Sequence, residues 1–189
     1  MASFLRSMTN CVLFPAAIVS LAMLSGCDEG SRAGVTALKI NGKTFYLEEA
    51  ITPSVRLKGL GERTNIETSG GMLFVFPDKD VHVQGFIMRD CPIPIDIIYL
   101  DGSGRVLVWH EMLAESPRTP EEGTVADLTS NDRAAGDRRT AYDNRLKSYS
   151  SKYPAQFVIE LKGGTIKSLD LKEGMQIKFD YAELKKRAS

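Results

Sequence analysis

The sequence predicts a mostly β, α+β fold: a single compact β-barrel-like domain with one or two short helices and a polar, partly helical insertion. Short apolar runs rich in β-branched and aromatic residues recur along the chain, and Gly, Pro and Asn-Gly turn signals separate them. The 189 residues are enough for one domain with its own core. Hydrophobic residues make up 43% and charged residues 25%, which are ordinary proportions for a soluble globular domain.

The first predicted element is a β-hairpin formed by residues 36–40 and 43–47. Asn41-Gly42 separates these two alternating runs. This pair is typical of a type I′ turn, in which two consecutive residues need a positive φ. We therefore expect two antiparallel strands that share an apolar face.

A short helix is predicted to begin at Thr52-Pro53 and to end near Gly59 or Gly61. Threonine can cap the first helical N–H groups with its side-chain oxygen, and proline suits the first helical position because it has no N–H to satisfy. Glycine is expected at the end of the helix because it readily adopts the left-handed conformation found there.

Further strands are predicted wherever a short apolar run lies between turn signals, namely at residues 71–76, 81–89, 95–100, 105–109, 155–161 and 175–179. The run at 95–100 is apolar on both faces, which indicates a central strand. Cys91-Pro-Ile-Pro94 is expected to be extended, since each proline disfavours a helical conformation of the residue before it. A short helix is predicted around residues 166–169.

The segment 115–152 is a polar insertion with many charges of both signs and few large apolar residues. A structureless loop of this length is uncommon in a compact domain, so part of it is expected to be helical. Tyr142, Leu146 and Tyr149 have the spacing of one helical face and would dock the insertion onto the sheet. The basic tail at residues 183–189 is expected to be frayed.

The N-terminal segment has the features of an export signal. One arginine near the start is followed by an uncharged, largely apolar stretch at residues 7–26. Leu24-Ser25-Gly26-Cys27 resembles the lipobox of bacterial lipoproteins. The resemblance implies that residues 1–26 are removed as a signal peptide, that the sulfur of Cys27 receives a diacylglyceryl group, and that residues 27–34 form a tether. An uncleaved membrane anchor, or a signal cut at another position, remains an alternative.

The expected location follows from this signal. The domain at residues 35–182 would be exported and lipid-anchored to a bacterial membrane, facing the periplasm or the cell exterior, with the membrane as its first partner. Of the three cysteines, Cys11 would be removed and Cys27 acylated, so only Cys91 would remain. The domain then has no internal disulfide and depends on its core.

Several segments resemble the domain-of-unknown-function family 192, also called uncharacterised protein family 0127. The segments that carry the resemblance are Gly71-Met-Leu-Phe-Val-Phe-Pro77, Phe86-Ile-Met-Arg-Asp90, Ile93-Pro-Ile-Asp-Ile-Ile98, Tyr153 to Leu161, and Lys172-Glu-Gly174. The family implies a compact β-barrel-like domain and no established activity. Two departures are Ile87, which replaces the family's tryptophan, and the longer insertion at 115–152.

The best polar cluster consists of Arg89, Asp90 and Asp96, and together with Met88 and His110 these are the candidate ligand-binding residues. Asp96 lies in the predicted central strand, and a buried carboxylate must be paired or hydrogen-bonded or its pKa rises. One interpretation places a carboxylate and a guanidinium at the rim of a ligand cleft. The alternative is structural: Asp96 accepts backbone N–H bonds from the Pro-Ile-Pro turn or pairs with Arg89.

The sequence predicts no catalytic constellation, metal site or cofactor. His110 and Glu111 are adjacent and would point to opposite faces of a strand, and no metal-binding spacing connects them to His82. Arg89 is the only sequence neighbour that could lower the pKa of the Cys91 thiol. Basic and acidic residues number 24 each, so no excess charge points to a nucleic-acid partner.

We therefore expect a membrane-tethered, non-catalytic domain that binds an unknown small molecule or envelope protein. One alternative is a small envelope hydrolase that uses Asp96 or Cys91. Another is an interaction module whose contact surface is the insertion at 115–152.

Overall fold

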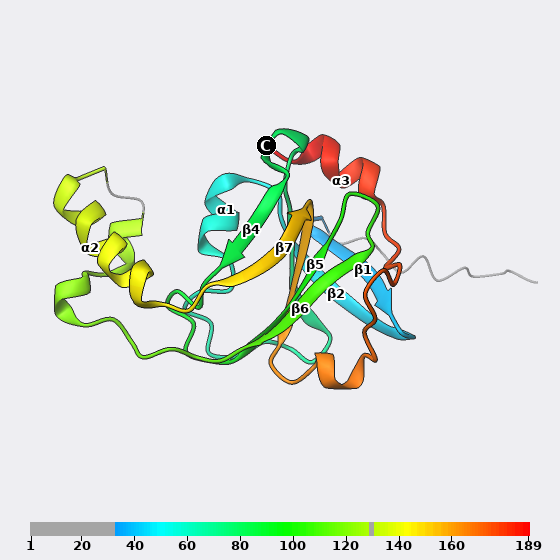
Figure 1. Cartoon of the computed structure of the whole chain (residues 1–189), viewed down its shortest axis with the longest axis horizontal. Coiled ribbons are helices and arrows are strands. Elements are labelled where there is room, and N and C mark those ends of the chain that lie inside the picture. The colour runs from blue at the N-terminus through cyan, green and yellow to red at the C-terminus, as the bar shows by residue number, and fades with distance from the viewer. Residues whose placement is uncertain (1–32, 129–130) are drawn as a thin grey trace, which may run out of the picture. The chain divides into compact units, whose positions relative to one another are not determined.

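The computed structural model describes residues 33–128 and 131–189 (Figure 1). The predicted signal peptide at 1–26, Cys27 and most of the predicted tether lie outside the described residues. Within the described ranges, no helix has both the length and the apolar character needed to cross a membrane.

The described part of the chain is a mixed α+β domain made mostly of strands. The main sheet has six strands in the order β1-β2-β3-β8-β5-β6, with bounds β1 Val35–Ile40, β2 Lys43–Ala50, β3 Gly70–Val75, β8 Phe157–Lys162, β5 Ile95–Leu100 and β6 Val106–Met112. Only β2 and β3 pair in parallel; the other neighbours are antiparallel. Strands β4 (His82–Phe86) and β7 (Tyr149–Ala155) form a separate antiparallel pair.

The prediction of a closed, barrel-like sheet was wrong, because both sheets are open. In the main sheet β1 and β6 are the two edge strands. β4 and β7 pair with each other instead of joining the main sheet, although Figure 1 shows them running across it. β4 is also shorter than the predicted strand at 81–89: it ends at Phe86, and the next residues turn away toward the insertion.

Seven helical segments occur in the described residues: the α-helices α1 Pro53–Lys58, α2 Arg133–Arg145 and α3 Tyr181–Arg187, and the 3₁₀ turns η1 Asp78–Asp80, η2 Pro120–Glu122, η3 Val125–Leu128 and η4 Ile166–Ser168. The predicted helix after Thr52 is confirmed, and it ends before Gly59, whose φ is 53°. Thr52 occupies the N-cap position without a side-chain capping bond, so that detail of the prediction was wrong.

The predicted hairpin and central strand are confirmed. Asn41 and Gly42 have φ values of 48° and 82°, so both residues of the turn are left-handed. All six residues of β5 are buried, and the strand pairs with β6 on one side and β8 on the other. Its two faces contribute to two separate apolar clusters, one with Ile98 and Leu100 and the other with Ile97 and Tyr99.

The predicted last strand at 175–179 is not formed. Its only ladder contact is an isolated bridge between Gln176 and Arg105. The chain then turns so that Phe179 packs edge-on against Phe157, with ring centroids 5.0 Å apart. Aromatic packing has replaced strand pairing at this point.

The insertion is partly helical, as predicted, but its three apolar side chains do not share one helix. Tyr142 lies in α2, Leu146 follows the end of that helix, and Tyr149 is the first residue of β7. All three are buried, so the docking role is retained although the helical register is not.

The basic tail was predicted to be frayed, and this was wrong. Residues 181–187 form α3, where the Asp180 side chain accepts a hydrogen bond from the Glu183 N–H at 3.0 Å. Leu184 is buried in the apolar cluster, and Arg187 pairs with Glu49 at 2.7 Å. Leu184, the partly buried Tyr181 and Ala188, and the Arg187–Glu49 ion pair together hold a mainly charged helix on the domain.

We expect Leu184→Ala to lower the free energy of unfolding by about 2–4 kcal/mol, because it removes a buried side chain and leaves a cavity. Urea unfolding followed by circular dichroism measures this value. Lys186→Ala on the same helix is the matched control and should change it by less than about 0.5 kcal/mol. Equal effects of the two substitutions would mean that α3 contributes no core contact.

Candidate functional site

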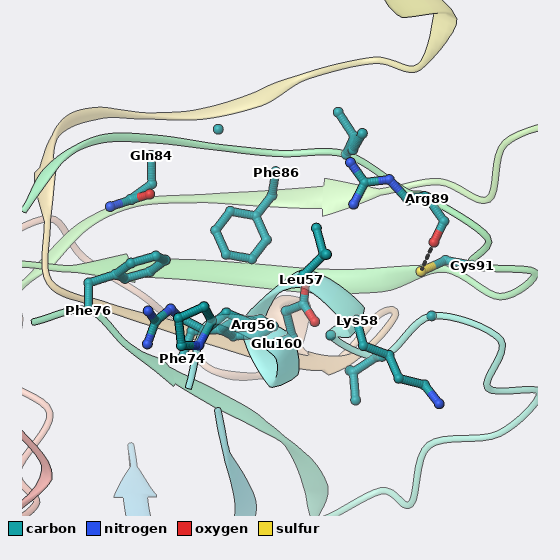
Figure 2. A pocket seen from close by; sticks show the side chains of 16 residues that line it. Arg56, Leu57, Lys58, Phe74, Phe76, Gln84, Phe86, Arg89, Cys91 and Glu160 are labelled. Carbon is teal, nitrogen blue, oxygen red and sulfur yellow. Dashed lines mark hydrogen bonds between the residues drawn. The ribbon is translucent and has the colours of Figure 1, made fainter. Parts of the chain in front are cut away.

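A cleft of about 420 Å³ lies between the end of α1, the Phe86–Cys91 segment and one face of the main sheet (Figure 2). Its volume is in the range of small-molecule sites. The side chains that carry its chemistry come from four parts of the chain. Helix α1 contributes Arg56 and Lys58, β3 and the residue after it contribute Phe74 and Phe76, and β8 contributes Glu160. The end of β4 and the segment that follows it contribute Phe86, Ile87, Arg89 and Cys91.

Glu160 is the central polar group of this cleft. It lies on β8, opposite Met72 of β3 and Ile97 of β5, so its backbone is held on both sides. The side chain is 6% exposed, and its Oε2 atom has no hydrogen-bond partner in the described structure. Figure 2 shows Glu160 between the phenylalanine side chains and Cys91.

Burial is the main reason why the Glu160 carboxyl group is a weak acid. Loss of water raises its pKa to about 8, and the positive charge of Arg63 and the N–H of Leu60 offset this only in part. The group is therefore mainly protonated at neutral pH. A neutral carboxyl group is also a hydrogen-bond donor, which an ionised carboxylate is not.

Three phenylalanines form the apolar wall. The rings of Phe74 and Phe86 meet edge to face with centroids 5.0 Å apart. The Arg56 guanidinium stands over the Phe76 ring at 5.3 Å from its centroid, while its Nη1 atom donates to the carbonyl oxygens of Ile51 and Val75 at 2.9 and 3.0 Å. These contacts hold the aromatic wall and one cation in fixed positions beside Glu160.

Gly59 keeps the space above Glu160 open. Its φ of 53° suits glycine, and a Cβ atom there would lie 3.3 Å from the Phe74 ring and 3.8 Å from Glu160 Oε2. Any side chain at this position would therefore project toward the aromatic wall and the carboxyl group. The glycine predicted at the end of the helix thus serves both the helix terminus and the cleft.

Cys91 lines the same cleft, but its surroundings disfavour a thiolate. The sulfur donates to the carbonyl oxygen of Arg89 at 3.3 Å. Burial, reinforced by the acidic groups of Glu160 and Asp90, raises the pKa of the thiol to about 12, and Arg89 lowers it only slightly. A nucleophilic cysteine needs the opposite environment, so the geometry does not support the Cys91 hydrolase alternative.

Arg89 and Asp90 connect the cleft to the insertion. Arg89 makes two hydrogen bonds to Asp143 of α2, at 2.8 and 2.6 Å, and Asp90 makes two to Arg118, at 2.7 and 2.8 Å. The Tyr142 hydroxyl accepts the Asp90 N–H at 3.1 Å. Both residues of the predicted cluster therefore hold the insertion in place, while Arg89 also lines the cleft.

Of the predicted cluster, only Arg89 lines the cleft, whereas Met88, Asp90, Asp96 and His110 do not. Asp96 accepts the Ile166 N–H at 2.8 Å, and burial raises its pKa while N–H groups of residues 164–166 oppose that rise. Asp96 therefore has the structural role that was the alternative to a ligand site, but its N–H donors come from the η4 turn and not from the Pro-Ile-Pro turn. His110 Nε2 lies 2.8 Å from the Ser150 carbonyl oxygen, and Met88 is buried in the core. The expected convergence of all five residues does not occur.

Sequence reasoning missed Glu160. The predicted strand at 155–161 places Phe157, Ile159 and Leu161 on one face and Glu160 on the other. The signal was present: Glu160 is the only charged residue in the run from Phe157 to Leu161, and its neighbour on the same face is Val158. A charged residue within a strand that is apolar on both sides indicates a buried carboxyl group.

A second cavity of about 260 Å³ adjoins the cleft. It shares Leu57, Lys58, Gly61 and Arg89 with the cleft, and the insertion contributes Val125 and Ala126 to its wall. In the described ranges, no group of three or more His, Cys, Asp or Glu side chains is placed to hold a metal ion.

The comparison with protein families identifies the class of this domain. Residues 36–179 match the DUF192 family, described as an uncharacterized ACR family, and the chain belongs to it. The resemblance seen in the sequence is thereby confirmed for the domain. Ile87, where the family pattern has tryptophan, lines the cleft, so this departure lies at the candidate site.

Two solved structures share the fold. One is a proposed transcription regulator from Sinorhizobium meliloti 1021, with a TM-score of 0.53 and 22% identity over 76% of this chain and 90% of that one. The other is a protein of unknown function from Novosphingobium aromaticivorans DSM 12444, with a TM-score of 0.55 and 22% identity over 77% of this chain and 83% of that one. At this identity the likeness concerns the fold alone. No curated protein matches the chain.

The buried carboxyl group makes stability depend on pH. Because the folded pKa of Glu160, about 8, is above its ordinary value of 4.5, the folded state holds the proton more tightly. The resulting stabilisation is complete below about pH 4.5 and is lost as the pH rises from there through 8, a change on the order of 5 kcal/mol.

We expect Glu160→Gln to remove this loss and to raise the melting temperature at pH 8.5 by several degrees, with little change at pH 5. Thermal unfolding at the two pH values measures the effect. Glu111→Gln, at an exposed site on β6, is the matched control. Parallel melting curves for wild type and Glu160→Gln across this pH range would contradict the assignment.

The Asp90–Arg118 pair should contribute strongly to docking of the insertion, since the two side chains are only 12% and 8% exposed. Each alanine substitution is expected to cost about 3 kcal/mol because it leaves a buried charge unpaired. A double-mutant cycle by urea unfolding should give a coupling energy of about 2 kcal/mol. The same cycle on the exposed Glu111–Lys167 pair should give less than about 0.5 kcal/mol, and equal couplings would argue against the docking role.

Proposed function

We propose that this chain is an exported, lipid-anchored domain that binds a small organic molecule in the cleft over Glu160 and does not transform it. The observation that carries the proposal is the buried carboxyl group of Glu160, which lines the cleft and whose Oε2 atom has no hydrogen-bond partner among the described residues. A buried polar atom without a partner costs stability unless something else satisfies it. A ligand group at hydrogen-bond distance would supply that partner.

The make-up of the cleft supports binding. Ligand sites are mostly apolar cavities with a few fixed polar groups that orient the ligand, and the cleft combines three phenylalanines with one carboxyl group. Glu160 is held by a strand that is paired on both sides, so its position is set before a ligand arrives. A preorganised group of this kind lowers the entropy cost of binding.

Neither group of the hydrolase alternative is placed for catalysis. The Cys91 thiol is held neutral, and Asp96 is committed to the N–H groups of the η4 turn. Both environments favour a structural role. The insertion forms part of the wall of the adjoining cavity, so we infer that it helps to shape the site.

The membrane anchor is supported by the sequence alone. The proposed lipidation site, Cys27, precedes β1 by a short polar stretch that could serve as a tether. Two or more acyl chains on one residue suffice for stable attachment. The domain would then present its cleft in the periplasm or at the cell exterior.

Cleft binding is tested with a substitution that fills the cleft. A library of small organic fragments is screened by ligand-detected NMR against the whole chain, and each binder is then tested with Ile87→Trp. We expect this substitution to weaken binding at least about tenfold, because a bulky ring occupies the ligand volume. Val83→Trp, on exposed β4 outside the cleft, is the matched control and should have no effect. If no fragment is sensitive to Ile87→Trp alone, the cleft is not a ligand site.

The anchor is tested by mass spectrometry of the natively expressed protein. We expect an N-terminal Cys27 that carries a diacylglyceryl group. The protein should also fractionate with membranes, and Cys27→Ser should abolish this whereas Cys91→Ser should not. An unmodified chain with its initial methionine, recovered from the cytosol, would refute the anchor and leave the cleft proposal to be judged separately.

A further inference from the structure

The class of ligand that suits the cleft depends on the proposed function. We propose that the cleft binds small organic acids, with the carboxylate of the ligand against the carboxyl group of Glu160 and its apolar body against Phe74, Phe76 and Phe86. The supporting geometry is that Glu160, the single acidic residue of the cleft, lies at its floor, while basic side chains line its mouth.

Basic side chains outnumber acidic ones in the lining of the cleft. Of the sixteen residues that line the cleft, three are basic (Arg56, Lys58 and Arg89) and one is acidic, Glu160. Arg89 is balanced by Asp143, and Arg56 interacts with the charge of Asp80, although its described hydrogen bonds all go to main-chain oxygen atoms. The mouth therefore carries a positive field that attracts an anion and repels a cation.

The groups around Glu160 determine whether its carboxyl group carries a proton. The ionisable groups that face it are Arg56, Lys58, Arg63, Arg89, Cys91 and Tyr99. Neither Cys91 nor Tyr99 adds a charge at neutral pH, since the pKa of each is raised by burial. Glu160 is itself mainly neutral and presents a donor to the cleft.

An ionised carboxylate is the acceptor that matches this donor best. A hydrogen bond to a charged acceptor is shorter and about twice as strong as one between neutral groups. An ammonium group could form an ion pair with Glu160 only after Glu160 lost its proton, and it would have to pass the cationic mouth. The arrangement thus selects against amines as well as in favour of acids.

The apolar wall restricts the body of the ligand. Phe74 and Phe86 meet edge to face, and Phe76 lies under Arg56. A cleft of about 420 Å³ lined in this way suits an aromatic or branched aliphatic group attached to a single acid.

The test uses three ligands with the same body and different heads: phenylpropanoate, phenylpropanol and phenylpropylamine. Binding to the whole chain is measured by isothermal titration calorimetry at pH 6.5. We expect the acid to bind at least about tenfold more tightly than the alcohol, and the amine to bind most weakly. An alcohol or amine that binds as tightly as the acid overturns the inference.

A pH series examines the role of Glu160. For the wild type, affinity for the acid should fall by roughly tenfold per pH unit above about pH 8, as Glu160 loses its proton. Glu160→Gln should weaken binding at pH 6.5 about fivefold, since an amide is a weaker donor. It should also remove the fall above pH 8, whereas Glu111→Gln should keep it. Affinity that rises above pH 8 would show that ionised Glu160 binds a cation and would overturn the inference.

The two proposals fail in different ways. If the acid does not bind but other fragments do, and Ile87→Trp abolishes their binding, the cleft is a ligand site and the organic-acid class is wrong. If no fragment is sensitive to Ile87→Trp, the proposed function fails and the ligand class fails with it.

Discussion

The site depends on one constraint: a carboxyl group is fixed on a strand that has neighbours on both sides. β8 pairs with β3 and β5, so Glu160 cannot move toward water without breaking the ladder. Gly71 contributes to this, because a Cβ atom there would lie 2.2 Å from the carbonyl oxygen of Glu160. The first residue of the Gly-Met-Leu-Phe motif is thus the one that lets β3 approach β8 so closely.

The segment from Phe86 to Cys91 links two functions of the fold. Phe86, Ile87 and Cys91 line the cleft, whereas Asp90 binds the insertion, and Arg89 takes part in both. A change in how the insertion docks would therefore reach the mouth of the cleft through a few residues of backbone. Arg89 and Asp90 of the family motif therefore have a structural role in this chain, because both hold the insertion.

Much of the local structure could be predicted from the sequence, because local chemistry decides it. Asn41-Gly42 requires a tight turn, Pro53 and Gly59 delimit a helix, and the continuous apolar run of β5 indicates a central strand. Predictions that needed distant contacts failed. The tail was expected to be frayed because its charges were visible in the sequence, but the buried position of Leu184 was not.

The sequence by itself determined the family, most of the strand segments, the hairpin turn and the presence of a lipobox-like N-terminus, since each depends on neighbouring residues. Only the tertiary structure decided that the sheets are open, that Asp96 holds a turn, and that Glu160 lies at the floor of a cleft. The reason is physical. Whether a carboxyl group is buried, partnered or facing a cavity depends on which strands pair beside it and which side chains close over it, and these come from residues far apart in the chain.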